Sequence, residues 1–540
     1  DASDCDDGEE NIYPGADETC NGDDDDCNGT VDDDYALDAS TWYDDSDGDG
    51  YGDPSTTTVA CDEPSGYTAD ATDCEPSDGT AYPGSTTTEV PADGIDQNCD
   101  GNDGCTDLNC DNQPDLAFAE YYSGSGYAGT LYLFYNDGAG GFSDSDSDQL
   151  ETQGAYDLDG ADIDGDGYQD LLVTNYYNGT RNIDSYVYWG STTGYSNTDR
   201  TGVRTQGALR GAISDVDGDG WQDLIFTGYH TDSSYEASGY VYYGASTGFS
   251  TSNRDTLPNK GGRDLEVEDL DGDGYEEVIV CNYYNGSYAV DSYVYWGSVT
   301  GFSTSNRTDL PTKGCRDVDV GDLDGDGNPD LVFANYYDGS YAIDSYIYYG
   351  TSTGYSTTLR EDLATQGTLN VLIADLDDDG YDDLTFGGYY NGGWGKTAST
   401  LVYWNSSAGF LSTNKTALGT RGVWEPVAQD VDGDGYLELF TPRYRSGSDF
   451  APDQYLYWGS ASGPSDSNRT DLSGNGNPRV ALGDLDGDGV SEAILPNYYT
   501  GSWNTLADST IYYGPTTSYG TTTTDLSTGG VWAAPLIVGE

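Results

Sequence analysis

The chain has 540 residues and is strongly acidic, with 98 Asp and Glu against 18 Lys and Arg and a formal net charge of −80. Such a charge repels nucleic acid and anionic lipid headgroups, so we expect neither as a partner. No hydrophobic run reaches transmembrane length, and we expect no direct membrane insertion. The acidity and the ten cysteines favour an extracellular or cell-surface protein.

Residues 1–104 differ in composition from the rest of the chain and are expected to form a separate domain. They hold six of the ten cysteines, dense Asp and few aliphatic side chains, in two divergent copies of one module at about 1–40 and 41–104. A segment this polar cannot build a sufficient apolar core, so disulfides and metal are expected to hold it together. Six cysteines allow many connectivities, and the sequence selects none of them. Zinc is the less favoured alternative, because His230 is the only histidine.

Two acidic stretches in this domain have the pattern of cation-binding loops. Residues 45–53 carry Asp at alternate positions, Gly at the turn and a further Asp at the end, and residues 24–32 fit a looser version of the pattern. Ca²⁺ takes six to eight oxygen ligands, which carboxylates and a main-chain carbonyl can supply. The expected ligands are Asp45, Asp47, Asp49, Tyr51 and Asp53 in one loop, and Asp24, Asp26, Asn28 and Asp32 in the other.

From residue 105 onwards, one nine-residue acidic loop recurs. Its template is D-x-D-G-D-G-x-x-[DE], with Asp378 in place of the first Gly in one copy and Asn109 in place of the second Asp in a degenerate first copy. The EF-hand shares this opening but closes with Glu at its twelfth position. That position is apolar here, as at Val173 and Phe226, within an expected strand. We therefore expect strand–loop–strand calcium sites, about eight to ten in the whole chain.

The expected ligands are the side chains at positions 1, 3, 5 and 9 of each loop, with the main-chain carbonyl at position 7. They are Asp107, Asn109, Asp111 and Asp115; Asp162, Asp164, Asp166, Tyr168 and Asp170; Asp215, Asp217, Asp219, Trp221 and Asp223; Asp269, Asp271, Asp273, Tyr275 and Glu277; Asp322, Asp324, Asp326, Asn328 and Asp330; Asp375, Asp377, Asp379, Tyr381 and Asp383; Asp430, Asp432, Asp434, Tyr436 and Glu438; and Asp484, Asp486, Asp488, Val490 and Glu492. Four clustered carboxylates repel one another unless a dication lies among them. We expect the calcium to be structural, with calcium sensing or calcium-bridged contacts between molecules as the alternative.

The loops recur every 53 to 55 residues, and a second marker keeps the same spacing. This marker is an aromatic strand ending in Gly or Asn, first TLYLFYN at 130–136 and last DSTIYYG at 508–514. An apolar strand follows each loop, as at 171–173. Short β-rich runs at such a period predict a solenoid, propeller or array. No segment has sustained helical periodicity, so the expected fold class is all-β.

The two ends of this region distinguish an open array from a closed ring. The first loop, at 107–115, has no apolar strand before it, whereas the last unit is followed by an extra apolar strand at 530–538. Pairing the two would remove both exposed sheet edges. We therefore expect an eight-bladed β-propeller over residues 105–540, closed by the C-terminal strand, with seven blades as the alternative.

The loops and their spacing resemble the FG-GAP/VCBS repeat family, the calcium-loop propellers that include the integrin α-subunit head. The resemblance covers about four-fifths of the chain. It implies Ca²⁺ between the first and second strands of each blade, in a protein that is usually extracellular. The N-terminal copies resemble the Asp/Cys-rich metal-binding modules of secreted bacterial proteins. Neither resemblance specifies a ligand.

Four cysteines lie outside the two modules. Cys105 and Cys110 are close enough in sequence to pair at the domain junction. Cys281 and Cys315 fall in strands of neighbouring blades, where they would form a disulfide or be two small buried apolar residues. The sequence leaves both possibilities open for the second pair.

Paired tyrosines recur in the turn after the second strand, beside Asn, Gly and Ser. Aromatic faces next to hydrogen-bonding side chains are typical of sugar-binding sites. The alternative is that the pairs wedge between blades and that Asn-Gly only forms the turn. The candidate ligand-binding residues are Tyr176, Tyr177, Tyr283, Tyr284, Tyr336, Tyr337, Tyr389, Tyr390, Tyr498 and Tyr499.

The sequence offers no catalytic residues, and we do not expect an enzyme. The chain has one histidine, and no His–Ser–Asp set can be assembled around it. Nearly every clustered Asp belongs to a loop. The expected function is adhesion or recognition of a glycan or a surface protein through one propeller face. The alternative is a structural subunit that assembles with copies of itself into a calcium-dependent extracellular filament or sheath, with residues 1–104 as the connector.

Overall fold

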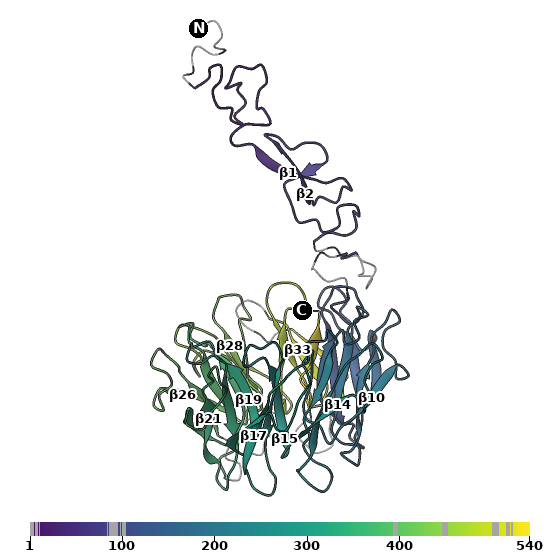
Figure 1. The fold of residues 1–540 in the computed structure, drawn as a ribbon, viewed down its shortest axis with the longest axis vertical. Coiled ribbons are helices and arrows are strands. Elements are labelled where there is room, and N and C mark those ends of the chain that lie inside the picture. The colour runs from purple at the N-terminus through teal and green to yellow at the C-terminus, as the bar shows by residue number, and fades with distance from the viewer. Residues whose placement is uncertain are drawn as a thin grey trace. The chain divides into compact units, whose positions relative to one another are not determined.

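The computed structural model describes residues 5, 9, 11–83, 85, 95–97, 99, 104–392, 398–444, 452–498, 507–514, 519 and 522–539. The chain divides into two compact units, Asp1–Asn112 and Gln113–Glu540 (Figure 1). The regular elements of the described residues are all strands, which confirms the all-β prediction. None of the described segments forms a helix of the length and apolarity that crossing a membrane requires.

The first unit has little regular structure and is held by disulfides. Its strands β1 (Ser40–Asp44), β2 (Asp53–Ala60) and β3 (Tyr67–Thr68) form one antiparallel sheet in the order β2-β1-β3. The buried apolar side chains in the described part are small or few, so covalent links replace a large core, as the sequence predicted. The disulfides are Cys5–Cys27, Cys20–Cys61, Cys74–Cys99 and Cys105–Cys110. Of these, Cys20–Cys61 joins the two module copies.

The second unit consists, in its described part, of eight antiparallel sheets that follow one another along the chain. Seven have four strands in sequence order. These are β7 (Ala155–Ala161), β8 (Asp170–Asn175), β9 (Asp184–Tyr188), β10 (Arg200–Arg204); β11 (Gly211–Ser214), β12 (Asp223–Phe226), β13 (Ser238–Tyr242), β14 (Arg254–Pro258); β15 (Gly262–Glu268), β16 (Glu277–Asn282), β17 (Ala289–Tyr295), β18 (Arg307–Lys313); β19 (Cys315–Gly321), β20 (Asp330–Asn335), β21 (Ala342–Tyr348), β22 (Arg360–Gln366); β23 (Thr368–Ala374), β24 (Asp383–Gly388), β25 (Ser399–Tyr403), β26 (Lys415–Arg421); β27 (Val427–Gln429), β28 (Glu438–Thr441), β29 (Gln454–Tyr457), β30 (Arg469–Leu472); and β31 (Ala481–Gly483), β32 (Glu492–Leu495), β33 (Ser509–Tyr512), β34 (Thr523–Leu526).

The remaining sheet combines strands from both ends of this unit. It contains β4 (Asp115–Tyr122), β5 (Ala128–Phe134) and β6 (Ser147–Gln153), together with β35 (Gly530–Val531) and β36 (Leu536–Val538). β36 pairs with β4 so that Val538 lies opposite Asp115, and β35 pairs further along, with Gly530 opposite Tyr122. Both edges of β4 are therefore occupied.

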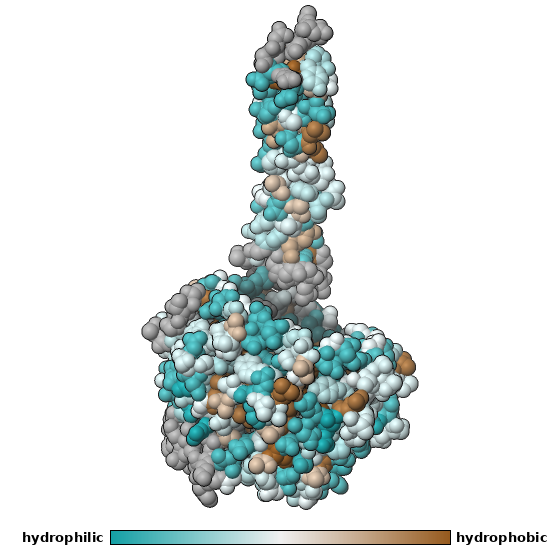
Figure 2. Space-filling view, turned by 90° about the vertical axis from the view of Figure 1, so that its left-hand side faces the viewer, coloured by the Kyte–Doolittle hydropathy of each residue, from teal (hydrophilic) through white to brown (hydrophobic). Residues whose placement is uncertain are grey.

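The hydrophobic core lies between neighbouring sheets rather than in one place. The middle strands are buried on both faces, as in β8, where every residue is buried. One cluster joins Ile279 and Val294 of one sheet to Leu331 and Phe333 of the next. Another joins Phe118 of the first sheet to Ile494 and Ile511 of the last. The face drawn in Figure 2 is mainly hydrophilic, with hydrophobic residues scattered over it.

The aromatic strand marker arises from contacts between sheets. In β9, the Tyr188 hydroxyl donates to the carbonyl of Glu151, 2.5 Å away on the preceding sheet. The equivalent hydroxyls of Tyr295 and Tyr348 do the same. Gly190 ends the marker because a Cβ there would lie 2.2 Å from the carbonyl oxygen of Gln169. The marker therefore records one bond and one close approach that recur in several of the sheets.

A disulfide also joins two neighbouring sheets. It links Cys281 of β16 to Cys315 of β19. Of the two possibilities that the sequence left open, the structure has the covalent link.

Candidate metal centres and the tyrosine face

The seven acidic loops from 162–170 to 484–492 each connect the first and second strands of a sheet. In each loop, main-chain N–H groups donate to the carboxylate of the first Asp. In the loop at 162–170, Asp162 Oδ1 accepts the N–H groups of Gly165 and Asp166 at 2.8 and 3.1 Å. Asp162 Oδ2 accepts the N–H of Gly167 at 2.9 Å. Both glycines have positive φ, 72° and 87°, which explains their place in the template. Asp378, which replaces the first Gly in the loop at 375–383, also has positive φ, 56°.

This backbone brings the predicted carboxylates together. In several loops, one oxygen from each of three carboxylates lies within 4.8 Å of the other two. The groups include Asp162, Asp164 and Asp166; Asp215, Asp217 and Asp223; Asp269, Asp271 and Asp273; and, in the first unit, Asp45, Asp47 and Asp49. Positions 1, 3 and 5 thus converge in three of these groups, and in the loop at 215–223 the group consists of positions 1, 3 and 9.

The carboxylate at position 9 ties each loop to a neighbouring turn. Asp170 Oδ2 accepts the N–H of Ile163 at 2.9 Å, and its Oδ1 accepts the N–H of Gly190 at 2.7 Å. Equivalent bonds occur in all seven loops from 162–170 to 484–492. Burial raises the pKa of Asp170 to about 8 and that of Glu277 to about 7. Without a nearby cation, these buried carboxylates resist ionisation.

Several loop oxygens are buried and have no hydrogen-bond donor in the described part of the chain. They are Oδ1 of Asp217 and Asp377, both carboxylate oxygens of Asp47, and Oδ2 of Asp49. Leaving an ionised carboxylate buried without a partner is costly. Burial and the neighbouring Asp219 raise the pKa of Asp217 accordingly. A hard divalent cation would supply the missing partner, so these residues fit a metal ion.

The first Asp of the degenerate copy at 107–115 bonds to its own main chain in the same way. Asp107 Oδ1 accepts the N–H groups of Asn109 and Asp111, and its Oδ2 accepts the N–H of Asn112. Asp115 begins β4 and is fully buried. The substitution of Asn109 for Asp therefore leaves the hydrogen-bonding scheme of the loop intact.

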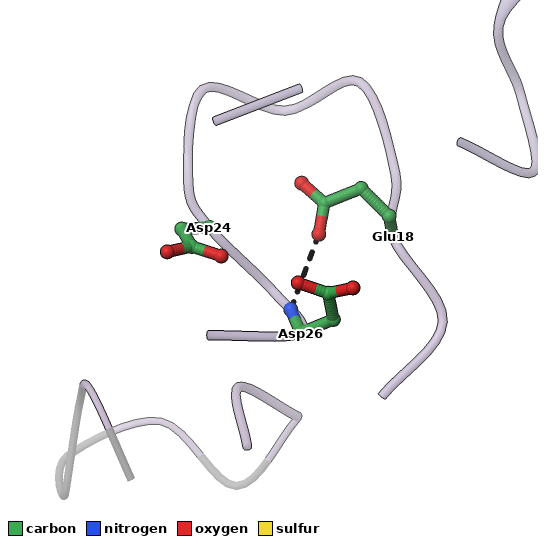
Figure 3. Close-up of side chains that lie close together, drawn as sticks. All are labelled: Glu18, Asp24 and Asp26. Carbon is green, nitrogen blue, oxygen red and sulfur yellow. Dashed lines mark hydrogen bonds between the residues drawn. The ribbon is translucent and has the colours of Figure 1, made fainter. Parts of the chain in front are cut away.

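In the N-terminal module, the structure adds a residue that the template missed. Glu18 lies beside Asp24 and Asp26, and one oxygen from each lies within 4.8 Å of the others (Figure 3). The Glu18 side chain is buried, with Oε2 accepting the N–H of Asp26 at 3.1 Å and Oε1 accepting the N–H of Asp32 at 3.2 Å. Glu18 precedes the nine-residue pattern by six residues.

The other predicted residues of these two loops make local bonds. Asp32 Oδ1 accepts the N–H of Asn21, while the Asn28 amide donates to Asp26. Asp53, at the start of β2, accepts the main-chain N–H and the hydroxyl of Ser55. Two expected ligands of the loop at 24–32, Asp24 and Asp26, are thus among the clustered carboxylates. In the loop at 45–53, the three clustered ligands are Asp45, Asp47 and Asp49.

Comparisons with known proteins match both units. The family model described as FG-GAP-like repeat matches residues 107–173, 215–280, 269–333 and 322–386, and each match begins at the first Asp of an acidic loop. The chain carries FG-GAP-like repeats. The model described as "Putative metal-binding motif" and named for MopE copper binding matches residues 4–33 and 73–103, within the two N-terminal modules. Both resemblances noted in the sequence are therefore confirmed.

No curated protein matches the chain. One solved structure, of a protein from Lactobacillus plantarum, aligns with 79% of this chain and 99% of its own at 11% identity, with a TM-score of 0.39.

Each sheet places one tyrosine at or just after the end of its second strand. In β8, Asn175 pairs with Ala155 at the end opposite Asp170 and Ala161, so the tyrosine turns lie away from the acidic loops. Ring contacts join neighbouring sheets at several of these positions, and they also join the first sheet to the last, where the Tyr121 and Tyr498 centroids are 6.4 Å apart. We call these residues the tyrosine set; they are Tyr121, Tyr176, Tyr229, Tyr283, Tyr336, Tyr389, Tyr444 and Tyr498.

Three members of the tyrosine set were missed in the sequence. The turns of Tyr229 and Tyr444 lack a second tyrosine, and Tyr121 follows Glu120 instead of the Asn that precedes most of the pairs. Their spacing of 53 to 55 residues from the neighbouring members is the signal that identifies them.

The second tyrosine of each pair makes different contacts. The ring of Tyr177 lies 4.7 Å from that of Tyr127 in the preceding sheet, and Tyr390 lies 4.6 Å from Tyr341 in the same manner. These rings fill the space between consecutive turns, which is the wedging contact of the alternative interpretation. Tyr499 lies outside the described residues.

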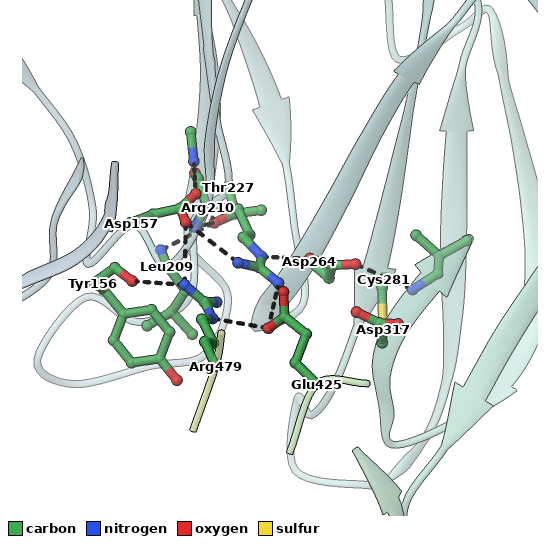
Figure 4. Close-up of polar contacts among 12 residues, drawn as sticks. Tyr156, Asp157, Leu209, Arg210, Thr227, Asp264, Cys281, Asp317, Glu425 and Arg479 are labelled. Carbon is green, nitrogen blue, oxygen red and sulfur yellow. Dashed lines mark hydrogen bonds and ion pairs between the residues drawn. The ribbon is translucent and has the colours of Figure 1, made fainter. Parts of the chain in front are cut away.

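A buried ion-pair network lies where the first strands begin (Figure 4). Arg210 bonds to Asp264 at 2.7 Å and to Asp157 and Glu425 at 3.3 Å, and Arg479 bonds to Glu425 at 2.8 Å. Burial alone would raise the pKa of Glu425, but the two guanidiniums outweigh it and lower that pKa. Each of these five residues stands three positions after the glycine that precedes a first strand. These five residues were not predicted from the sequence, although their fixed position after the glycine is visible there.

Proposed function

We propose that this protein is an extracellular, calcium-stabilised, eight-bladed β-propeller that recognises a glycan or a surface protein through the tyrosine set. The observation that carries the proposal is that FG-GAP repeats place clustered carboxylates at one end of their strands and one tyrosine per sheet at the other. The metal loops and the recognition surface are then separate, so one can stabilise the fold while the other meets a ligand.

A closed ring is supported by contacts between the ends of the second unit. β36 completes the sheet of β4, and the apolar cluster around Phe118 and Ile494 joins the first and last sheets. The contact between Tyr121 and Tyr498 repeats the join at the tyrosine end. In an open row, sheets this far apart in sequence would not meet.

Calcium is the cation that the donor sets favour. The clustered groups in the propeller loops offer carboxylate oxygens, and no cysteine of the described chain is free. Oxygen-only sites with several carboxylates and a flexible geometry suit Ca²⁺ better than Zn²⁺ or copper, which prefer nitrogen or sulfur. Five disulfides and millimolar-class calcium sites are typical of proteins outside the cell.

Recognition is supported by the composition of the tyrosine end. Its rings are only partly buried, and polar side chains lie among them. Partly exposed aromatic faces with convergent hydrogen-bonding groups are the usual architecture of a binding site for sugars or protein side chains.

Two measurements test the proposal in millimolar calcium. Labelled protein is applied to a panel of glycans and cell-surface proteins, and its native mass is determined by light scattering with and without chelator. Tyr176→Ala should abolish binding, whereas Tyr243→Ala should not, because Tyr243 ends a third strand on the side of the acidic loops. Equal binding by both variants would contradict recognition through the tyrosine set. Large calcium-dependent polymers that require residues 1–104 would instead favour the filament.

A further inference from the structure

We infer that the tyrosine end contains an anion site formed by Arg263 and Arg316, and that it accepts the carboxylate of a uronic acid in an acidic glycan. This inference rests on the proposed function, because it specifies the chemistry of the glycan that the tyrosine set would recognise.

The two arginines are held by aromatic rings instead of carboxylates. The guanidinium carbon of Arg263 lies 5.3 Å from the ring centroid of Tyr229 and 5.8 Å from that of Tyr283. The guanidinium carbon of Arg316 lies 5.3 Å from the Tyr283 centroid and 5.2 Å from that of Tyr336. Neither arginine takes part in an ion pair among the described residues. In a chain with 98 acidic residues, two adjacent guanidiniums without a carboxylate partner require an explanation.

The nearest carboxylates are already engaged elsewhere. Asp264 accepts Arg210 with Oδ1 and the N–H of Val318 with Oδ2. Glu425 is shared by Arg210 and Arg479. Asp317 accepts the main-chain N–H of Val371, and burial and Asp264 raise its pKa. The ion-pair network therefore satisfies its own arginines and leaves the positive charge of Arg263 and Arg316 uncompensated.

A neighbouring side chain supports a local demand for an anion. Burial alone would raise the pKa of Tyr156, but Arg263, Arg316 and Arg479 outweigh it and lower that pKa. The guanidinium carbon of Arg479 lies 5.9 Å from the Tyr156 ring centroid, and Tyr156 lines the same cavity as the other two arginines. The surroundings of this ring thus favour negative charge.

The space available fits one small anionic group. A cavity of about 20 Å³ is lined by four arginines and three carboxylates, so the positive side chains outnumber the acidic ones. The charged lining residues are Arg210, Arg263, Arg316, Arg479, Asp264, Asp317 and Glu425. That volume holds about one water molecule, and so one carboxylate oxygen. A guanidinium binds a carboxylate through paired, charge-assisted hydrogen bonds, and the flanking tyrosines can stack on the sugar ring that carries it. A uronic acid offers both parts, whereas a neutral sugar lacks the charge and a free inorganic anion lacks the ring.

The test compares methyl β-D-glucuronide with methyl β-D-glucoside, which differ only in the carboxylate. Binding to the full chain is followed in millimolar calcium by saturation-transfer NMR and tryptophan fluorescence. We expect the glucuronide to bind at least about tenfold more tightly than the glucoside, and the double variant Arg263→Gln/Arg316→Gln to lose that difference. Arg200→Gln/Arg204→Gln is the matched control, because both arginines lie on β10, where they pair with Glu151 and Asp184, and the change removes the same number of charges.

The calcium-saturated melting temperature verifies that the variants fold. If the double variant does not fold, the single variant Arg316→Gln keeps the guanidinium of Arg263 and should still weaken glucuronide binding several-fold. Equal binding of glucuronide and glucoside by the wild type, or glucuronide binding that the variants leave unchanged, would overturn the inference. So would preferential binding of a peptide with a free carboxyl terminus over both sugars. Binding of neutral glycans that survives the double variant would refute the anion site alone, whereas a panel without any ligand would refute the proposed function.

Discussion

Asp157 and Arg479 are separated by 322 residues in the sequence, and Nη1 of Arg479 lies 3.3 Å from Oδ1 of Asp157. Asp157 belongs to β7, and Arg479 directly precedes β31. Each also has a second partner in the same ion-pair network: Asp157 bonds to Arg210, and Arg479 bonds to Glu425. Residues at one position of different repeats meet in this way when the repeats surround a common axis, which is the arrangement that we propose.

Arg479→Met should lower the free energy of unfolding by about 3–5 kcal/mol. The Arg479 side chain is 3% exposed, and its loss leaves Glu425 and Asp157 with less compensation inside the protein. Arg204→Met, at a half-exposed pair, should cost at most about 1 kcal/mol. Chemical denaturation in saturating calcium measures both. Adding Glu425→Gln to Arg479→Met should cost less than the two single changes combined, and strict additivity would show that the network is not coupled.

Asp217→Asn should have opposite effects with and without calcium. The change removes an ionised group whose Oδ1 is buried without a donor, so the chelated protein should become no less stable. In calcium, the variant should bind one ion fewer per chain and unfold at a lower temperature. Native mass spectrometry and thermal unfolding measure these effects. Asp146→Asn, an exposed change outside the loops, is the control; the same loss of an ion there would argue against loop binding.

The stability of the chelated protein should fall as pH rises from about 4 to about 8. Burial raises the pKa of Asp170 from 3.8 to about 8, and burial raises that of Glu438 from 4.5 to about 7. Across this window, the folded chain without cations binds more protons than the unfolded chain, so the free energy of unfolding decreases with pH. Calcium competes with those protons, and its affinity should increase over the same range. Melting temperatures in chelator that rise from pH 5 to 8 would contradict this.

How much of the molecule the sequence predicted depends on how local each feature is. The loop at 162–170 was visible because its ligand spacing and its glycines are fixed by a nine-residue backbone path. The all-β class followed in the same way from short aromatic and apolar runs. Glu18 and Arg210 were missed, because their partners come from segments that only the folded chain brings near. Disulfide connectivity could not be predicted for the same reason, because Cys20 bonds to Cys61 of the other module.

The tyrosine set is intermediate between features that a local motif predicts and features that depend on contacts in the folded chain. The motif around Tyr176 was readable, but Tyr229 follows Gly228 and precedes His230, so no local signature marks it. Its position is set by the end of β12, and only the repeat spacing carries that information. A search by period rather than by motif would have found it.

The disulfide between β16 and β19 should contribute about 3–4 kcal/mol to stability. It closes a segment with a sequence separation of 34, and in the chain-entropy model its main effect is to restrict the unfolded chain. The variant Cys281→Ala/Cys315→Ala should therefore unfold at lower denaturant concentration with its calcium stoichiometry unchanged. Cys105→Ala/Cys110→Ala is the comparison, because a separation of 5 gives a smaller entropic gain. A lost calcium ion in the first variant would indicate that the disulfide shapes a loop instead.

A chain that ends after residue 529 tests the closure of the ring. It lacks β35 and β36, so β4 loses the partners opposite Ala117 and Tyr122 and presents an open sheet edge. Open edges of this kind pair with other chains, and we expect the truncated protein to aggregate and to melt at a lower temperature. Light scattering and thermal unfolding measure this, and a synthetic peptide of residues 530–540 should restore the monomer. If the truncated chain stays monomeric with an unchanged melting temperature, the C-terminal strands do not close the first sheet, and the sheets form an open row.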